Sequence, residues 1–196
     1  MTYIDFHTHH VPSAADVVAV VDGRDTWGLH PWRATEELIV PDLSAKLAIG
    51  ECGLDAMQGP SMEVQENVFL QQVALSEHVG KPLIIHCVKA LDRLLHLRRE
   101  QHPAMPWMFH GFRGKPQRLH SLLDAGFYVS FGFHHNEESL RLCPLERLML
   151  ETDDEKRPVA ELYNNVAAVR GIDVSFLCDA MTKNYLAFSQ KEPLMT

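Results

Sequence analysis

The chain has 196 residues, 46% of them hydrophobic, and a formal net charge of −8. This length and apolar content suffice for one substantial core, so we expect a single domain over residues 1–196. The negative charge argues against a broad electrostatic attraction to DNA or RNA, although it is compatible with a local basic rim. There is no membrane-length apolar stretch, no signal-peptide pattern and no C-x-x-C pair among the four cysteines. We therefore expect a cytoplasmic protein with reduced thiols and no association with a membrane.

The first predicted strand, Tyr3 to His9, carries two histidines separated by one residue. Because the side chains of a strand alternate between its faces, Asp5, His7 and His9 are expected to point the same way. Two imidazoles on one face can bind a divalent metal, and Asp5 would be close enough to orient them or to share their polar cluster. A lone His-x-His is equally consistent with polar residues on a wet strand, so the pattern alone does not define a metal site.

The rest of the chain alternates short apolar runs with helical patterns. The apolar runs predict strands over 16–22, 46–51, 83–86, 105–110, 127–131 and 145–150. The Val-rich run 16–22 suits a strand buried on both faces, and residues 27–32 form an extended segment closed by Pro31. Helical spacing predicts helices over 61–79, 90–100, 117–125, 137–142, 159–170 and 174–188. About eight strands with helices between most of the later ones favour a parallel α/β sheet or barrel.

Residues of the kinds that bind metals lie at the ends of five predicted strands. They are His7, His9, Glu51, His86, His110 and Asp153. In a closed parallel barrel the C-terminal strand ends form one rim, so these six side chains would converge at the barrel mouth. Any one of them could instead cap a turn or meet water, but six in this arrangement are hard to attribute to chance.

Several motifs, in this order along nearly the whole chain, resemble the TatD-related DNase family, metal-dependent hydrolases of the wider amidohydrolase-type barrels. The motifs are Asp5-x-His7-x-His9, Gly28-Leu29-His30-Pro31, Gly50-Glu51-Cys52-Gly53-Leu54-Asp55, Ile85-His86, His110-Gly111-Phe112-x-Gly114, Glu151-Thr152-Asp153 and the closing Asn184-x-x-x-Phe188.

The resemblance implies two divalent ions held by ligands from different strands: His7, His9 and Asp153 for one, His86 and His110 for the other, and Glu51 as a bridge. Two cations about 3.5 to 4 Å apart can bind a phosphodiester, activate a water and stabilise the leaving oxygen. Asp153 would also accept a proton from that water, so Asp153 and Glu51 are the predicted catalytic residues. Imidazole and carboxylate ligands suit zinc or manganese, whereas magnesium prefers oxygen ligands, and all three ions stay open.

Four residues outside this set are predicted to contact substrate. His30 matches the family's Gly-x-His-Pro and would touch substrate or support the ligands. Three basic residues follow His86 or His110 and would bring positive charge to a phosphate, namely Lys89, Arg113 and Lys115. A solvated loop is an equally good interpretation of these three. Of the adjacent pair His134 and His135, we expect at most one to face the site.

The chain also departs from the family. Such barrels usually need about 250 residues and rarely fewer than ~200. Seven residues separate His9 from Val17, the first apolar residue of the next run, too few for a crossover helix. We therefore expect a compact variant of the TIM-type (β/α) barrel with some early helices missing. Asp154-Glu155 replaces the family's small residue and proline, and Val88 stands where an arginine is common. These changes leave the ligands intact but weaken the case for the family's nucleic-acid contacts.

These features predict a metal-dependent hydrolase that cleaves phosphodiester bonds of DNA with a metal-activated water. One alternative is hydrolysis of a small phosphoester or an amide by the same ions. Another is a metal-binding relic whose shortened barrel no longer orients a substrate. The sequence leaves the oligomeric state open.

Overall fold

The structure is a computed structural model that describes residues 1–190, and it contains two compact units. One unit combines Met1–Val21 with the described part of His110–Thr196, and the other consists of Asp22–Phe109. The single domain expected from the chain length stays a prediction. Within the described residues no helix is both long enough and apolar enough to cross a membrane.

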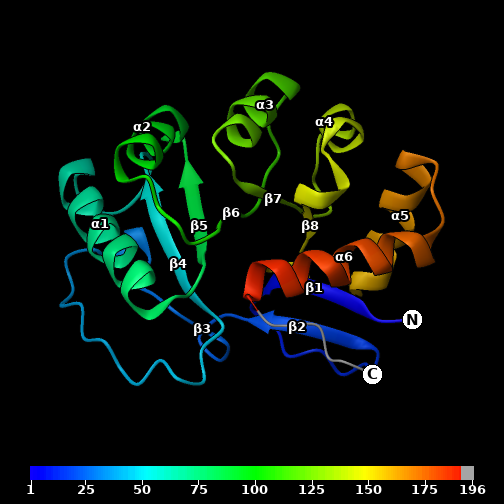
Figure 1. The fold of residues 1–196 in the computed structure, drawn as a ribbon, viewed down its shortest axis with the longest axis horizontal. Helices are drawn as coiled ribbons and strands as arrows, with labels where there is room; N and C mark the ends of the chain where they lie inside the picture. Colours follow the sequence, from blue (N-terminus) through cyan, green and yellow to red (C-terminus); the bar gives the residue numbers. More distant parts are fainter. Residues whose placement is uncertain (191–196) are drawn as a thin grey trace. The chain divides into compact units, whose positions relative to one another are not determined.

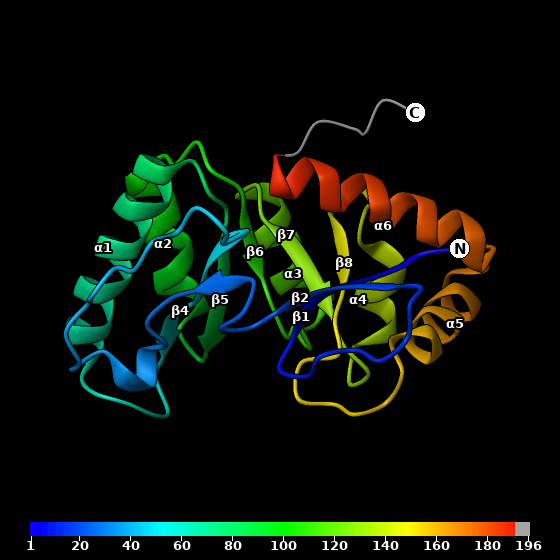
Figure 2. The same cartoon turned by 90° about the horizontal axis from the view of Figure 1, so that it is seen from below.

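The Asp22–Phe109 unit contains four parallel strands in chain order: β3 (Thr26–Trp27), β4 (Ala48–Asp55), β5 (Leu83–Val88) and β6 (Trp107–Phe109). Helix α1 (Met62–Val79) joins β4 to β5, and α2 (Leu91–Gln101) joins β5 to β6. Figures 1 and 2 show both helices on one side of β4 and β5. Apolar side chains of these elements are fully buried, including Ile49, Phe69, Ile84 and Trp107. This packing buries the apolar runs from which the strands were predicted.

The bounds of α1 agree with its sequence signals. Ser61 is the residue before the helix and Gly80 ends it with a φ of 65°. A left-handed residue at this place satisfies the last turn, and glycine adopts that conformation without strain.

Strand β4 is longer than predicted. The sequence indicated an end at Glu51, but the strand continues to Asp55, so Glu51 lies within the strand. Glycines interrupt this segment because β4 approaches β5 closely: a Cβ on Gly50 would lie 2.6 Å from the Ile84 carbonyl oxygen, and one on Gly53 would lie 2.0 Å from that of His86. Gly50 and Gly53 lie where the two backbones approach closely and not in a turn. Because glycine is also typical of turns, the end of the strand predicted from the sequence was wrong.

The other unit has two pairs of parallel strands. β1 (Tyr3–Thr8) pairs with β2 (Val17–Val21), and β7 (Tyr128–Phe131) pairs with β8 (Leu148–Leu150). Its helices are α3 (Pro116–Asp124), α4 (Glu137–Leu142), α5 (Val159–Arg170) and α6 (Val174–Ser189). Helices α5 and α6 pack on β1 (Figure 1). The Tyr163 hydroxyl of α5 donates to the Ile4 carbonyl at 2.8 Å and accepts from the Ile4 amide at 3.0 Å.

The early crossover helices are missing, as predicted. In the described chain, no helix joins β1 to β2, and a single turn, η1 (Pro31–Arg33), is the only helical piece before α1. Without a crossover helix, Val18 of β2 is 40% exposed. The expectation that this Val-rich strand is buried on both faces is therefore wrong.

Candidate metal-binding site

Two histidines and one carboxylate converge at the end of β1. The Nε2 atoms of His7 and His9 lie 3.7 and 3.5 Å from Oδ1 of Asp153. One ligand atom from each of the three residues lies within 4.8 Å of the others. Two imidazoles and a carboxylate form a donor set that suits a divalent ion such as zinc. The three residues predicted to share one ion thus fit that ion.

Backbone hydrogen bonds place Asp153 between the two histidines. Its amide donates to the His7 carbonyl at 3.0 Å, and its carbonyl accepts from the His9 amide at 3.1 Å. Asp153 has a φ of 56°, in the left-handed region that aspartate tolerates better than most residues. The backbone conformation at Asp153 therefore directs its short side chain toward the imidazoles of His7 and His9.

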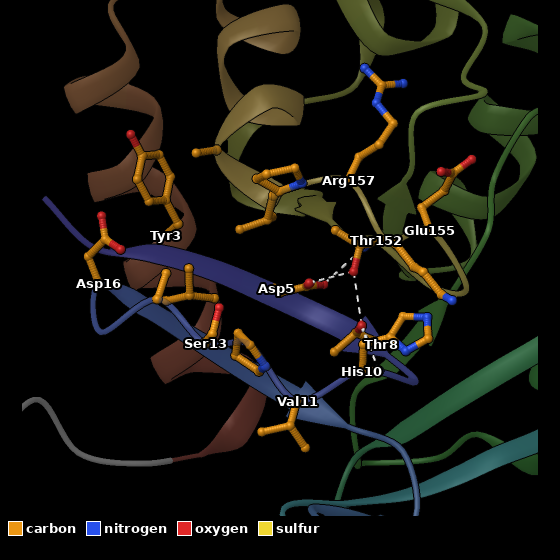
Figure 3. A pocket seen from close by; sticks show the side chains of 17 residues that line it. Tyr3, Asp5, Thr8, His10, Val11, Ser13, Asp16, Thr152, Glu155 and Arg157 are labelled. Atoms are coloured by element: carbon orange, nitrogen blue, oxygen red, sulfur yellow. Dashed lines mark hydrogen bonds between the residues drawn. The ribbon is translucent and has the colours of Figure 1, made fainter.

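Asp5 acts on this segment through Thr152. Its carboxylate accepts from the Thr152 amide at 3.0 Å and from the Thr152 hydroxyl at 2.7 Å, and this hydroxyl lies 2.9 Å from that of Thr8 (Figure 3). The three residues line a cavity of about 290 Å³ between the loops that follow β1 and β8. Burial is the main reason that the pKa of Asp5 is raised to about 7. Asp5 thus fixes the residue that precedes Asp153.

Beside His110 lies the carboxylate of Glu151, which belongs to one of the sequence motifs but was given no role there. Oε1 of Glu151 lies 3.4 Å from Nδ1 of His110 and accepts from the Gly111 amide at 2.5 Å. Glu151 is fully buried, and the His110 and His7 rings have centroids 4.7 Å apart. A carboxylate at Nδ1 favours a proton on that nitrogen and leaves Nε2 for a ligand. In the sequence, the only sign that Glu151 belongs to the site was its position directly after the predicted strand that ends at Leu150.

A second cluster lies within the Asp22–Phe109 unit. The two ring nitrogens of His86 approach two carboxylates: Nδ1 is 2.8 Å from Oε1 of Glu51, and Nε2 is 3.1 Å from Oδ2 of Asp55. Burial acts to raise the pKa of Asp55, but hydrogen bonds from Trp32 and Met57, followed by His86, outweigh it, and the pKa lies below its ordinary value. An ionised Asp55 can orient His86 while the opposite nitrogen faces Glu51. Sequence reasoning gave Asp55 no role.

His30 joins this second cluster. Its Nε2 lies 3.4 Å from Oε1 of Glu51, and its Nδ1 accepts from the Trp32 amide at 3.3 Å. Atoms of His30, Glu51 and His86 are close enough to share an ion. However, a neutral ring that accepts at Nδ1 carries its proton on Nε2, so His30 is better suited to donate to Glu51 than to bind metal.

A cavity of about 550 Å³ opens beside Asp153 within its own unit. Its wall includes Arg113, His134 and Lys156. Arg113 thus shares a cavity wall with Asp153, and its assignment to substrate binding stays a prediction. His134 is the member of the histidine pair that lines the cavity. The ring of His135 instead lies 2.8 Å from the Gly132 carbonyl oxygen. Lys156 was not identified from the sequence.

The other two predicted basic contacts lie elsewhere. Lys115 is the residue before α3 and is not among those that line this cavity. Lys89 is exposed after β5, with a φ of 54°. Their assignment to substrate binding stays a prediction.

Comparison with known sequences gives consistent relatives. The family model described as TatD related DNase matches residues 4–190. The chain is 30% identical over 186 residues to the uncharacterized metal-dependent hydrolase YcfH of Escherichia coli K12, covering 81% of this chain and 70% of that protein. It is 32% identical over 146 residues to the 3'-5' ssDNA/RNA exonuclease TatD of Escherichia coli K12, covering 65% of this chain and 56% of the exonuclease.

Solved structures share the fold. The TatD homologue YjjV from Escherichia coli K12 has a TM-score of 0.73 at 20% identity, with 90% of this chain and 78% of the other covered. A TatD-family hydrolase from Entamoeba histolytica also has a TM-score of 0.73, at 18% identity, with 88% and 74% covered.

Fold and family agree with the expectations from the sequence. Parallel strands with helical crossovers, shared with these solved structures, define an α/β fold of the barrel type. The family model and the relative YcfH add the class of enzyme, a metal-dependent hydrolase. The chain belongs to the TatD-related DNase family. The predicted family, fold class and class of enzyme are thereby confirmed, whereas the role of each site residue stays a prediction.

Proposed function

We propose that this protein cleaves phosphodiester bonds of DNA with a metal-activated water. The observation that carries the proposal is the cluster of His7, His9 and Asp153, whose carboxylate lies on the wall of a cavity that also contains Arg113 and Lys156. A metal-type donor set beside two cationic side chains suits a phosphate group. The similarity to a 3'-5' ssDNA/RNA exonuclease supports a nucleic-acid substrate.

The proposed cofactor is a pair of divalent ions, zinc, manganese or magnesium. His7, His9 and Asp153 would hold one ion, His86 and His110 the other, and Glu51 would bridge them. Bound ions of this kind lower the pKa of water and stabilise charge on phosphate oxygens.

Side chains of the protein would accept the proton, orient the ligands and bind the phosphate. The side chain of Asp153 is 29% exposed, so it can accept a proton from a water in the cavity. Glu151 lies beside Nδ1 of His110, and Asp55 fixes the ring of His86. Arg113 and Lys156 would bind the phosphate, and His30 would donate a hydrogen bond toward Glu51.

The test uses metal-stripped protein with zinc, manganese or magnesium added back. Substrates are a single-stranded DNA oligonucleotide and a simple phosphodiester. Replacing Asp153 by Asn removes a ligand charge and the proton acceptor, so we expect Asp153→Asn to lose roughly 100-fold or more of the metal-dependent DNA cleavage. Asp179→Asn, which changes an exposed carboxylate of α6, is the matched control and should cleave as the wild type does.

Each of the other outcomes would assign a different function to the protein or contradict the proposed site. Cleavage of the simple ester alone would replace DNA by a small phosphoester as the substrate. Bound metal with no turnover of either compound would indicate a metal-binding relic. DNA cleavage that survives Asp153→Asn would contradict the proposed site.

A further inference from the structure

Trp32 is an exposed tryptophan beside the cluster of His30, Glu51 and His86, and the catalytic roles proposed above do not include it. Its surface is 47% exposed. Its ring centroid lies 4.5 Å from that of His30 and 5.8 Å from that of His86. The indole therefore borders the predicted catalytic groups of its own unit while much of it faces solvent.

The indole is held in place by hydrogen bonds. Its Nε1 donates to Oδ2 of Asp55 at 2.7 Å. Asp55 is itself fixed, because its other oxygen accepts from the Met57 and Gln58 amides at 2.8 and 3.1 Å. An exposed side chain on a mobile loop would lose rotamer freedom when a ligand binds, whereas one that is already fixed loses little.

The backbone under the indole is equally constrained. Trp32 lies in the single turn η1, which begins after His30 and contains Pro31. Gly59 packs so tightly behind this turn that a Cβ there would lie 3.0 Å from Cα of Trp32 and 2.9 Å from the Pro31 carbonyl oxygen. The turn thus presents the indole in one orientation.

We propose that Trp32 is a stacking surface for a nucleobase of single-stranded nucleic acid. This inference rests on the proposed function and names the part of the substrate that the indole contacts. A chain with a net charge of −8 cannot hold a polyanion by its overall field, so a contact that does not depend on charge would add to the few local cations. Stacking on an aromatic face provides one for every base. The neighbouring His30, Glu51 and His86 belong to the proposed catalytic groups, so a base stacked on Trp32 would lie beside them.

The experiment measures binding without catalysis. Fluorescence anisotropy in EDTA compares a short labelled single-stranded DNA oligonucleotide with an abasic oligonucleotide of the same length and charge. Stacking is worth enough that Trp32→Ala should weaken binding of the base-bearing oligonucleotide by about 5- to 100-fold and should largely erase its advantage over the abasic one. Trp32→Phe keeps an aromatic face, although a smaller one, and loses the hydrogen bond to Asp55, so it should retain most of that advantage. Phe176→Ala, which removes a 54% exposed aromatic side chain from α6, is the matched control.

The outcomes separate this inference from the proposed function. Unchanged binding by Trp32→Ala, an equal loss for both oligonucleotides, or no binding of DNA by the wild type would each overturn the stacking role. DNA cleavage with unchanged binding by Trp32→Ala would leave the nuclease intact and remove only the stacking. Selective loss in Trp32→Ala without cleavage by the metal-loaded wild type would support the base contact and contradict the nuclease.

Discussion

Asp5 shows how a single buried carboxyl couples the stability of the folded chain to pH. Its pKa is raised to about 7 in the folded protein, chiefly by burial, against about 3.9 for an unperturbed aspartate. Between these values the folded chain keeps the proton that the unfolded chain releases. The stability contributed by protonated Asp5 is therefore full below about pH 4 and is lost as the pH rises through about 7.

We expect Asp5→Asn to flatten this part of the pH dependence. Asparagine stays neutral and its carbonyl can still accept from Thr152, so the mutant should lose less stability than the wild type between about pH 5 and pH 7.5, by on the order of 1 to 3 kcal/mol. Urea unfolding of metal-free protein measures the difference. Asp16→Asn serves as control, because Asp16 lines the same cavity but is exposed. Parallel pH profiles for wild type and Asp5→Asn would contradict the expectation.

Residues whose chemical type suggests metal binding could be picked out from the sequence, whereas residues whose proposed role depends on their contacts could not. Two histidines on one strand and a carboxylate after another are visible as motifs. The roles proposed for Glu151, Asp55 and Trp32 rest on what these residues touch: an imidazole nitrogen for the first two, and Asp55 for the indole. These contacts join positions far apart in the chain or separated by a turn, so spacing alone does not reveal them.

At the scale of elements, local signals predicted the helices well. α4 and α5 have the predicted bounds, and α1, α2, α3 and α6 differ by one residue at one or both ends, because capping residues and apolar spacing are encoded locally. Strands were harder to place. Residues 145–147 form the 3-10 turn η2 and not the start of a strand, and β4 runs beyond its predicted end. The absence of early helices was predicted from the short segment between His9 and the next apolar run. The exposure of Val18 was not predicted, because it results from the lack of a crossover helix over β2.

One side chain connects α1 to the segment that carries His30. The amide of Gln72 is fully buried and bonds both backbone groups of Leu29: its Oε1 accepts from the Leu29 amide at 2.7 Å, and its Nε2 donates to the Leu29 carbonyl at 3.0 Å. Gln72→Met has a similar length but leaves both groups unpaired, so we expect a loss of about 2 to 5 kcal/mol in the free energy of unfolding. Urea unfolding tests this, with Gln71→Met, an exposed neighbour on the same helix, as control. Equal stability of the two mutants would disprove the role of Gln72.

The proposed role of Glu51 concerns the whole molecule, because Glu51 belongs to Asp22–Phe109 while His7, His9 and Asp153 belong to the other unit. If Glu51 bridges two ions, Glu51→Gln should lower the affinity for both by about 10-fold or more, whereas His9→Asn should weaken one more than the other. Titration calorimetry of metal-free protein with zinc or manganese, together with metal content after dialysis, distinguishes these cases. Loss of a single ion in Glu51→Gln would show that each cluster binds its metal independently.

The division into units also has a consequence for the order of events on the ribosome. All residues of Asp22–Phe109 are consecutive, so this unit can begin to fold before synthesis is complete. β1 must wait, because the residue that lies between its histidines is Asp153, and α5 and α6, which pack on it, are made later still. His7 and His9 are therefore synthesised long before Asp153, whose carboxylate completes their cluster. If this cluster holds an ion as proposed, the ion would bind at a late step, and a truncated product that stops before Asp153 would lack it.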